Sequence, residues 1–210
     1  PEALEWHVCD PADDVLSRRL ARCAAERGAR LVIHPSPMFL TPLDVIKTQM
    51  GGKKKPFMFT FYQSQRRRIG IFVDLAGSTI GGQWSYDTEN RQRLPKGHRA
   101  PEVPEFLPTP HLVEAQSYVA QRFPLARGQA AVFRWPLTRA QAQAELHAFL
   151  HGRLALFGHY EDAISQGQPW LYHSMLSVPL NAGLITPQEI VDETLAFAAE
   201  HPVPLNSLEG

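Results

Sequence analysis

The sequence predicts an α/β segment followed by an all-α region, so that the chain as a whole is predominantly helical. Three observations support this fold class. A helical pattern ends at Gly28 and is followed by the short apolar run 31–33, and helix, glycine and strand in this order form half of a βαβ unit. Beyond Thr109 the apolar residues recur at helical spacing. Residues 69–90 are rich in glycine and residues 94–110 in proline, which favours turns and extended connections between the two parts.

Four capping residues, each followed by proline, predict where helices begin. A side-chain oxygen before the helix accepts an orphan backbone N–H, and proline is well suited to the first helical position. These capping residues are Asp10, Thr41, Thr109 and Thr186. Together with the apolar patterns and the glycine stops, they predict helices over residues 10–27, 42–50, 56–68, 110–122, 139–156, 177–182 and 187–200.

The composition excludes several classes of protein. The 210 residues carry 21 basic and 21 acidic side chains, which excludes a polycation, and 44% hydrophobic residues exclude a disordered chain. The two cysteines, Cys9 and Cys23, exclude a disulfide framework and an all-cysteine metal cage. No apolar run approaches the roughly 18 residues that a membrane span needs. We therefore expect a globular, cytoplasmic protein without a membrane partner. Because the chain starts at Pro1 and stops shortly after an apolar stretch, we also expect an internal fragment of a longer protein.

The charges are balanced in total but not along the chain. Residues 45–73 hold seven basic residues and no acidic one, whereas residues 154–210 hold seven acidic residues and no lysine or arginine. The basic stretch could follow a phosphate backbone, with its interleaved aromatic residues beside it. The alternative is a solvated helix face whose aromatic side lies in the core. The charge pattern alone favours this alternative.

Generic catalytic and metal-binding motifs give no function. His147 and His151 lie four residues apart on a predicted helix, which suits two metal-binding nitrogens. No third ligand is evident, so a solvated helix face is favoured and no metal site is predicted. The nucleophile elbow of hydrolases, the dinucleotide-binding glycine motif and the P-loop pattern are all missing from the sequence.

Two stretches are more particular than these motifs. Residues 81–91 (Gly-Gly-Gln-Trp-Ser-Tyr-Asp-Thr-Glu-Asn-Arg) could fold on themselves, with Arg91 pairing Asp87 or Glu89, or could present their rings and polar groups to a ligand groove. Ser174 and Ser177 precede a short predicted helix. Their hydroxyls and the free N–H groups there could bind a phosphate, or the serines could simply cap the helix.

These stretches and two others carry a family resemblance. The other two are residues 55–67 (Lys-Pro-Phe-Met-Phe-Thr-Phe-Tyr-Gln-Ser-Gln-Arg-Arg) and residues 157–163 (Phe-Gly-His-Tyr-Glu-Asp-Ala), and the serine stretch continues to Leu184. In order and spacing they resemble the bacterial photolyase-related proteins, the iron–sulfur branch of the photolyase/cryptochrome superfamily that includes bacterial (6-4) photolyases. The resemblance covers nearly the whole chain. One departure is Gln63, where many relatives carry arginine.

The resemblance implies a domain organisation and a function. Residues 1–45 would be the C-terminal part of a Rossmann-like α/β domain, residues 46–108 an interdomain connection, and residues 109–210 the first part of a helical FAD-binding domain. The implied function is that of a light-driven DNA photolyase, a carbon–carbon lyase that repairs UV pyrimidine lesions, of the (6-4) type, by electron transfer from reduced FAD. A cryptochrome-like blue-light photoreceptor and a flavin-free helical interaction module remain as alternatives.

The resemblance also implies site residues. The cofactor contacts would be Tyr160, His173, Ser174, Met175, Leu176 and Ser177, with the serines at the FAD diphosphate. The interdomain loop would include Trp84, Tyr86, Asp87, Asn90 and Arg91. Damaged DNA is the implied partner of a monomeric enzyme, and its phosphates could be contacted by Lys53, Lys54, Lys55, Arg66, Arg67 and Arg68. The catalytic residues are expected beyond Gly210, and neither a 4Fe-4S cluster nor a ribolumazine antenna would be bound by these residues.

Overall fold

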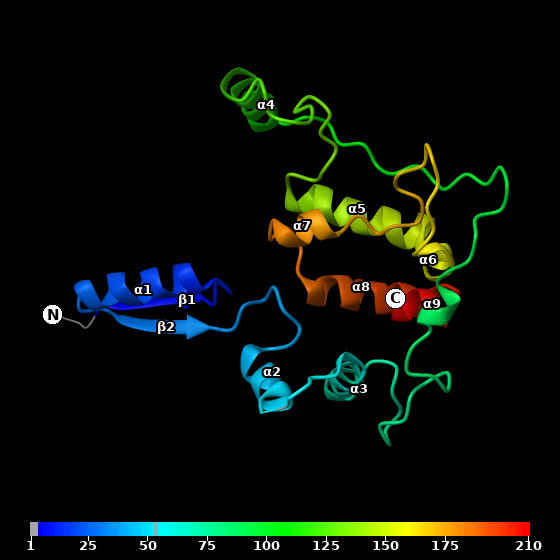
Figure 1. The fold of residues 1–210 in the computed structure, drawn as a ribbon, viewed down its shortest axis with the longest axis horizontal. Helices are drawn as coiled ribbons and strands as arrows, with labels where there is room; N and C mark the ends of the chain where they lie inside the picture. The colour runs from blue at the N-terminus through cyan, green and yellow to red at the C-terminus, as the bar shows by residue number, and fades with distance from the viewer. Residues whose placement is uncertain (1–3, 53) are drawn as a thin grey trace. The chain divides into compact units, whose positions relative to one another are not determined.

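The computed structural model describes residues 4–52 and 54–210 of the chain (Figure 1). They divide into two compact units, one comprising Pro1–Ile80 with Thr186–Gln188 and the other Gly81–Ile185 with Glu189–Gly210. The described residues are predominantly helical with one small parallel sheet, as the sequence predicts. The division after Ile80 differs from the expected boundaries at residues 45 and 108, which describe functional domains and stay predictions.

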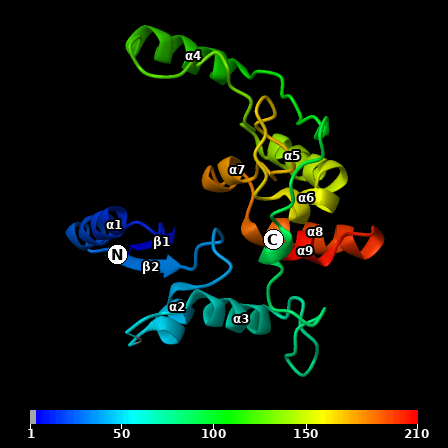
Figure 2. The same cartoon turned by 45° about the vertical axis from the view of Figure 1, so that its right-hand side comes forward.

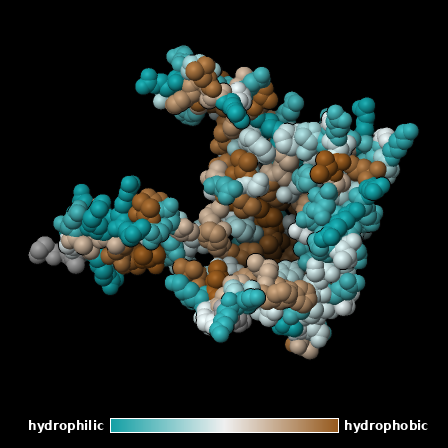
Figure 3. Space-filling view, viewed as in Figure 1, coloured by the Kyte–Doolittle hydropathy of each residue, from teal (hydrophilic) through white to brown (hydrophobic). Residues whose placement is uncertain are grey.

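A complete βαβ unit forms the start of the first unit. Strands β1 (Glu5–Cys9) and β2 (Arg30–His34) are parallel and paired along their whole length, and α1 (Asp14–Glu26) connects them. Figure 3 shows that the outward side of α1 is largely hydrophilic. The sequence predicts α1 and β2 but misses β1, because only Trp6 and Val8 mark the inward face of this short strand.

Helix α1 begins later than predicted. Asp10 does not cap it but accepts the N–H of Ala12 at 2.9 Å, and Ala12 has a left-handed φ of 51° that interrupts the helical conformation. The cap is Asp13, whose carboxylate accepts the N–H of Leu16 at 2.7 Å. The predicted stop is confirmed, since Gly28 follows the helix with a φ of 64°.

The rest of the first unit consists of two helices and a tight turn. Helices α2 (Leu43–Met50) and α3 (Met58–Ile69) lie close to their predicted spans. Thr41 does not cap α2; instead its hydroxyl donates to the side-chain oxygen of Gln65 at 3.0 Å. Residues 71–80 reverse direction through an antiparallel bridge, which confirms the turn expected there.

The second unit is built from helices and long irregular connections (Figures 1 and 2). Residues 92–109 contain no regular element, in line with their proline content. None of the described helices is both long and apolar enough to cross a bilayer. The elements are the short 3-10 helix η1 (Asp87–Glu89), α4 (Pro110–Arg122), α5 (Arg139–Gly152), α6 (Leu154–Tyr160), α7 (Ser177–Asn181), α8 (Pro187–Glu200) and α9 (Leu205–Glu209).

The helix predicted over residues 139–156 is wrong in one respect, because it is broken at Arg153. This residue leaves helical geometry with φ −127° and ψ −28°, and its side chain is only 1% exposed. Its guanidinium donates to the buried carboxylate of Glu145 at 3.1 Å, and Arg134 donates to the other oxygen of Glu145 at 3.0 Å. A buried arginine needs such a partner, and burial lowers the pKa of Arg153 while the bond to Glu145 opposes that shift.

The short helix α9, which was not expected from the sequence, follows α8.

The core of the second unit lies along α5 and α6. Its buried members are apolar residues that recur at helical spacing, together with two from the segments on either side of α7: Ala142, Leu146, Phe149, Leu150, Leu154, Leu176 and Ile185. Replacing a fully buried leucine of this kind with alanine typically costs about 2–5 kcal/mol. This core fixes the turn before α7, where the sequence predicts the cofactor contacts.

Candidate functional site

The predicted cofactor segment forms a turn between the core and α7. Leu176 is 5% exposed and belongs to the hydrophobic core, and Met175 is 8% exposed. These two side chains therefore face the protein interior, and only their backbone groups are available to a ligand. Ser174 and His173 are half-buried, whereas Ser177 is exposed and is the first residue of α7.

The backbone of this turn has the geometry of an anion-binding concavity. Met175 has a left-handed φ of 65°, and Leu176 follows in the right-handed region with φ −86° and ψ −10°. Successive residues of opposite hand direct their N–H groups toward one point, which favours an anion there. Leu176 is the N-cap residue of α7, and among the residues that the structure describes no side-chain capping bond is made to this helix. The alternative that the serines serve as helix caps is therefore wrong.

Tyr160, shortly before the predicted cofactor segment in the sequence, packs against the aromatic rings of Tyr172 and His98. Its ring centroid lies 5.3 Å from that of Tyr172 and 5.8 Å from that of His98. The Nε2 atom of His98 lies 2.6 Å from the hydroxyl of Tyr172, which is 3% exposed. Burial, and then the neighbouring Tyr160, raise the pKa of the Tyr172 hydroxyl. The sequence does not predict a role for His98, because this residue lies in a proline-rich segment with no motif of its own.

The loop 81–91 folds onto its own unit. Arg91 donates to Asp87 at 2.6 Å, which confirms the internal ion pair weighed from the sequence. The backbone N–H of Tyr86 donates to Glu209 at 2.8 Å, and the hydroxyl of Tyr86 donates to the carbonyl of Gly81 at 2.9 Å. Gly81 is required there, because a Cβ atom would lie 2.2 Å from that hydroxyl.

The end of the same loop is tied to the end of α6. The side-chain amide of Asn90 donates to Glu161 at 2.6 Å, and Asn90 is only 4% exposed. The carbonyl of Asn90 accepts the N–H of Asp162 at 3.3 Å. Trp84 is half-buried. The hydroxyl of Tyr86, the carboxylate of Asp87, the side-chain nitrogen of Asn90 and the guanidinium of Arg91 thus have partners within the protein, which favours a structural role for these parts of the loop.

The basic stretch is largely committed to the fold of the first unit. Arg66 is 3% exposed and donates to the carbonyl of Phe72 at 2.7 Å. Arg67 donates to the carbonyl of Gly77 at 3.1 Å, and Arg68 donates to that of Leu40 at 2.7 Å. These bonds favour a role within the fold, most clearly for Arg66, which has almost no surface to offer a phosphate.

The lysines of this stretch differ from the arginines. Lys54 and Lys55 are exposed, whereas Lys53 lies outside the described residues. The aromatic residues of this stretch are buried only in part: Phe57 is 68% and Phe59 is 45% exposed, whereas Phe61 and Tyr62 are half-buried. The predicted phosphate contacts therefore rest mainly on the exposed lysines.

The paired histidines gain a third neighbour. The ring centroids of His147 and His151 lie 4.1 Å apart, and that of His201 lies 5.7 Å from that of His151. Burial first, and then the two neighbouring histidines, lower the pKa of His151. Within residues 4–52 and 54–210, no three His, Cys, Asp or Glu side chains are placed to hold a metal ion.

A family model and a curated relative both relate this chain to the photolyases. The model of the deoxyribodipyrimidine photo-lyase-related protein family matches residues 2–135. A (6-4) photolyase of Agrobacterium fabrum is 30% identical over 203 residues, which cover 97% of this chain and 40% of that protein. The uncharacterized protein R852 of Acanthamoeba polyphaga mimivirus is 34% identical over 93 residues, 42% of this chain and 47% of the viral protein. The chain thus spans about two fifths of the curated photolyase that it matches. Since the family model covers more than half of the sequence, the chain belongs to the deoxyribodipyrimidine photo-lyase-related protein family.

Proposed function

We propose that this chain contributes part of the FAD-binding domain of a light-driven DNA photolyase of the (6-4) type. Membership of the photolyase-related family supports a photolyase-like function. The observation that carries the flavin part of the proposal is the turn from Ser174 to Ser177, where two serines flank a backbone of alternating hand at Met175 and Leu176.

The turn fits the diphosphate of FAD in its donor chemistry. Met175 and Leu176 have opposite backbone handedness, and such a concavity suits a phosphate oxygen. The hydroxyls of Ser174 and Ser177 add neutral donors, and phosphate is well served by hydroxyl and backbone N–H donors together. Because α7 has only five residues, the concavity and not a helix dipole would provide most of the attraction.

The chain's own residues would bind and orient the cofactor. FAD, when bound and reduced, would supply the photoexcited electron that repairs a flipped pyrimidine lesion. Ser174 and Ser177 would hold its diphosphate, and the half-buried His173 would contact a phosphate or the ribityl chain. Tyr160 would form a wall of the site, kept in place by Tyr172 and His98.

Damaged DNA is the proposed substrate. Lys54 and Lys55 are exposed and would contact its phosphates without regard to sequence, in a manner weakened by salt. Damaged bases stack poorly, which would favour extrusion of the lesion toward the flavin.

The test is the visible absorption spectrum of the native protein, purified without added flavin. We expect flavin bands in the wild type and their loss in Ser174→Ala with Ser177→Ala. Hydrogen bonds to a charged group contribute about 1.5–3 kcal/mol each, so the Kd for FAD should rise by at least roughly tenfold per hydroxyl.

The matched control is Ser78→Ala with Ser117→Ala, which removes two exposed hydroxyls elsewhere in the chain and should keep the bands. A folded, colourless wild type that takes up no added FAD would refute the proposal. So would a serine double variant that binds FAD as tightly as the control.

A further inference from the structure

Two histidines meet on the exposed face of the small parallel sheet. His7 lies in the middle of β1, and His34 is the last residue of β2. The Nδ1 atom of His7 lies 2.9 Å from the Nε2 atom of His34, and both side chains are exposed to solvent. We call these two side chains the histidine pair. Its members are 27 residues apart in the sequence, so no local spacing indicates it.

The backbone of the sheet fixes the position of both histidines. In the parallel register His7 lies opposite Val32, and Cys9 lies opposite His34. The ladder continues beyond the strands, because the N–H of Asp10 donates to the carbonyl of His34 at 2.8 Å. Side chains carried by paired strands are held more precisely than side chains on loops. The histidine pair therefore loses little conformational freedom when it binds a ligand.

Glu5 determines which nitrogen of His7 carries the proton. The Nε2 atom of His7 lies 3.3 Å from the carboxylate of Glu5, which also accepts from Arg30 at 2.8 Å. In a neutral imidazole this contact keeps the proton on Nε2, so that Nδ1 directs a lone pair toward His34. Histidines that bind metals usually donate their second N–H to a carboxylate in this way. A metal ion can then replace the proton between the two rings, while His34 carries its own proton on Nδ1.

The distance between the two nitrogens matches that between neighbouring ligands of one metal ion. An imidazole nitrogen lies about 2.0–2.1 Å from a bound Zn²⁺, so two such ligands at a right angle are about 2.9 Å apart. At the tetrahedral angle they are about 3.3 Å apart, which a small turn of either ring provides. Imidazole suits Cu²⁺, Ni²⁺ and Zn²⁺, whereas Mg²⁺ and Ca²⁺ prefer oxygen ligands.

The remaining coordination positions of such an ion would face solvent. Within the described ranges 4–52 and 54–210, no third His, Cys, Asp or Glu is placed to complete a metal cluster. Water would therefore fill the other positions. A structural zinc site, in contrast, has all four positions occupied by protein.

We propose that the histidine pair binds one divalent first-row transition-metal ion, through Nδ1 of His7 and Nε2 of His34, with Glu5 orienting the ring of His7. The ion would connect β1 to β2 and so stabilise the sheet. The site shares no residue with the proposed flavin or DNA contacts, and it does not depend on the proposed function.

The test is isothermal titration of the full chain, without a histidine tag, with NiCl₂. His7→Ala with His34→Ala should bind one equivalent of Ni²⁺ less than the wild type. His111→Ala with His201→Ala removes two exposed histidines from other parts of the chain and should bind as much as the wild type. In the wild type, Ni²⁺ should also slow hydrogen exchange in β1 and β2.

Glu5→Gln tests the orienting carboxylate separately. Loss of such an outer partner typically costs about 10–100-fold in metal affinity. We therefore expect the Kd for Ni²⁺ at this site to rise by at least roughly tenfold while the equivalent remains. An unchanged Kd would contradict the role of Glu5.

Three results would overturn the proposal: equal binding by the His7 and His34 double variant and the wild type, an equal loss in the His111 and His201 control, or loss of the same equivalent in Cys9→Ser. The last result would mean that a thiolate holds the ion. Displacement of Ni²⁺ by MgCl₂ at a similar concentration would also overturn it, because such a site prefers oxygen ligands. Ni²⁺ binding that survives in a protein without flavin bands would count against the flavin proposal alone.

Discussion

Two arginine-containing regions of this chain look alike in sequence and differ in structure. Arg66, Arg67 and Arg68 each donate to a backbone carbonyl within the first unit. Arg93 and Arg99 in the second unit line an open groove with no carboxylate paired to them among the described residues. The three adjacent arginines are thus less available to a ligand than the two that lie apart. Whether a guanidinium is available depends on the hydrogen-bond acceptors that the fold brings to it, and the density of charge along the sequence does not indicate those acceptors.

A third group of arginines, Arg134 and Arg153, is the most strongly committed to the fold, and it provides the largest expected effect. Glu145→Ala would leave Arg153 buried with no carboxylate and would free Arg134, whose pairing distance to Glu145 is 3.0 Å. Removing one partner of a buried ion pair typically costs about 3–5 kcal/mol. We expect a loss of that size in the free energy of unfolding, measured by urea denaturation.

The control for this change is Glu102→Ala, at an exposed carboxylate of the irregular segment 92–109. Exposed positions of this kind usually change stability by less than about 0.5 kcal/mol. Equal effects of the two substitutions would mean that burial does not distinguish these carboxylates.

The next effect concerns the comparison directly. Arg66→Ala would remove a nearly buried guanidinium and its bond to the carbonyl of Phe72, which still accepts the N–H of Ile80 at 2.9 Å. A hydrogen bond made by a charged group contributes about 1.5–3 kcal/mol, so we expect a loss in that range. Hydrogen exchange should report it locally, as faster exchange in residues 71–80.

Arg93→Ala is the matched substitution on the other side of the comparison. It should change the free energy of unfolding by less than about 0.5 kcal/mol, because the side chain is exposed and no carboxylate in the described part of the chain pairs with it. If Arg93→Ala destabilised the protein as much as Arg66→Ala, the division into structural and available arginines would fail.

The parts of the fold that the sequence predicts well are those with local causes. Helix α4 begins at Pro110 as expected, because the Thr109 hydroxyl accepts the N–H of Leu112 at 3.2 Å, three residues along the chain. The left-handed turn at Gly28 is equally local. The predicted cap at Asp10 is wrong because two possible capping residues, Asp10 and Asp13, lie close together in the sequence. The left-handed backbone of Ala12 places the start of the helix after the second of them.

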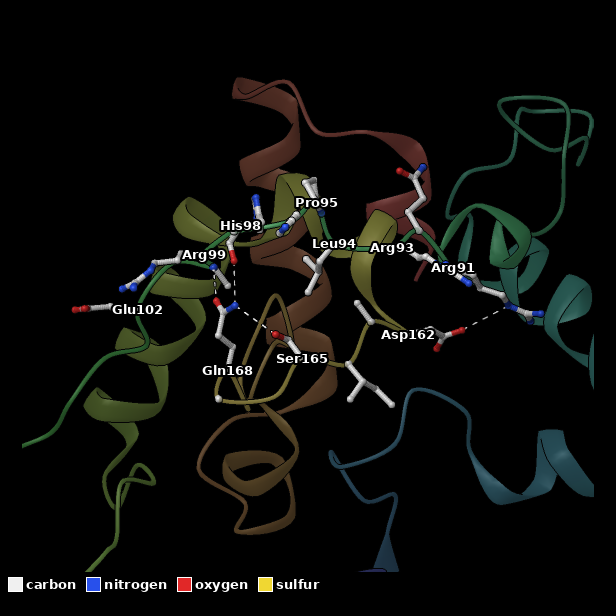
Figure 4. A pocket seen from close by; sticks show the side chains of 17 residues that line it. Arg91, Arg93, Leu94, Pro95, His98, Arg99, Glu102, Asp162, Ser165 and Gln168 are labelled. Atoms are coloured by element: carbon white, nitrogen blue, oxygen red, sulfur yellow. Dashed lines mark hydrogen bonds and ion pairs between the residues drawn. The ribbon is translucent and has the colours of Figure 1, made fainter.

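The parts that the sequence does not predict depend on distant partners. His98 meets Tyr172 across 74 residues, and nothing in the sequence near either one indicates the other. Gly158 is required because a Cβ atom would lie 2.5 Å from the backbone nitrogen of Ser207, in a helix that was not expected at all. The groove that residues 91–102 and 162–168 line together (Figure 4) is not predicted for the same reason, because its cations come from a segment that the sequence indicates only as a connection. In the candidate cofactor turn, residue types predict the donors, whereas the inward direction of Leu176 follows from the core.

The smallest expected effect extends the comparison to a carboxylate. Burial, and then the nearby Asp162, Asp87 and Glu209, raise the pKa of Glu161, and its bond from Asn90 opposes that shift. The folded state therefore binds the proton of Glu161 more tightly than the unfolded state, whose pKa stays near the ordinary 4.5. The stability that this group contributes is complete below that value and is lost as pH rises through the raised folded pKa.

Glu161→Gln tests this sign, because glutamine resembles the protonated acid and keeps an oxygen that can accept from Asn90. We expect the variant to be more stable than the wild type at pH 7 and the difference to shrink toward pH 5, in urea denaturation at both pH values. Glu102→Gln changes an exposed carboxylate and should give a difference that does not vary over the same range. A difference for Glu161→Gln that grew on acidification would mean that the bond from Asn90 outweighs burial and the neighbouring carboxylates. Glu161, which joins the end of α6 to Asn90 of the loop 81–91, would then be stabilised as an ionised group, in the same way as the paired Glu145 of the core.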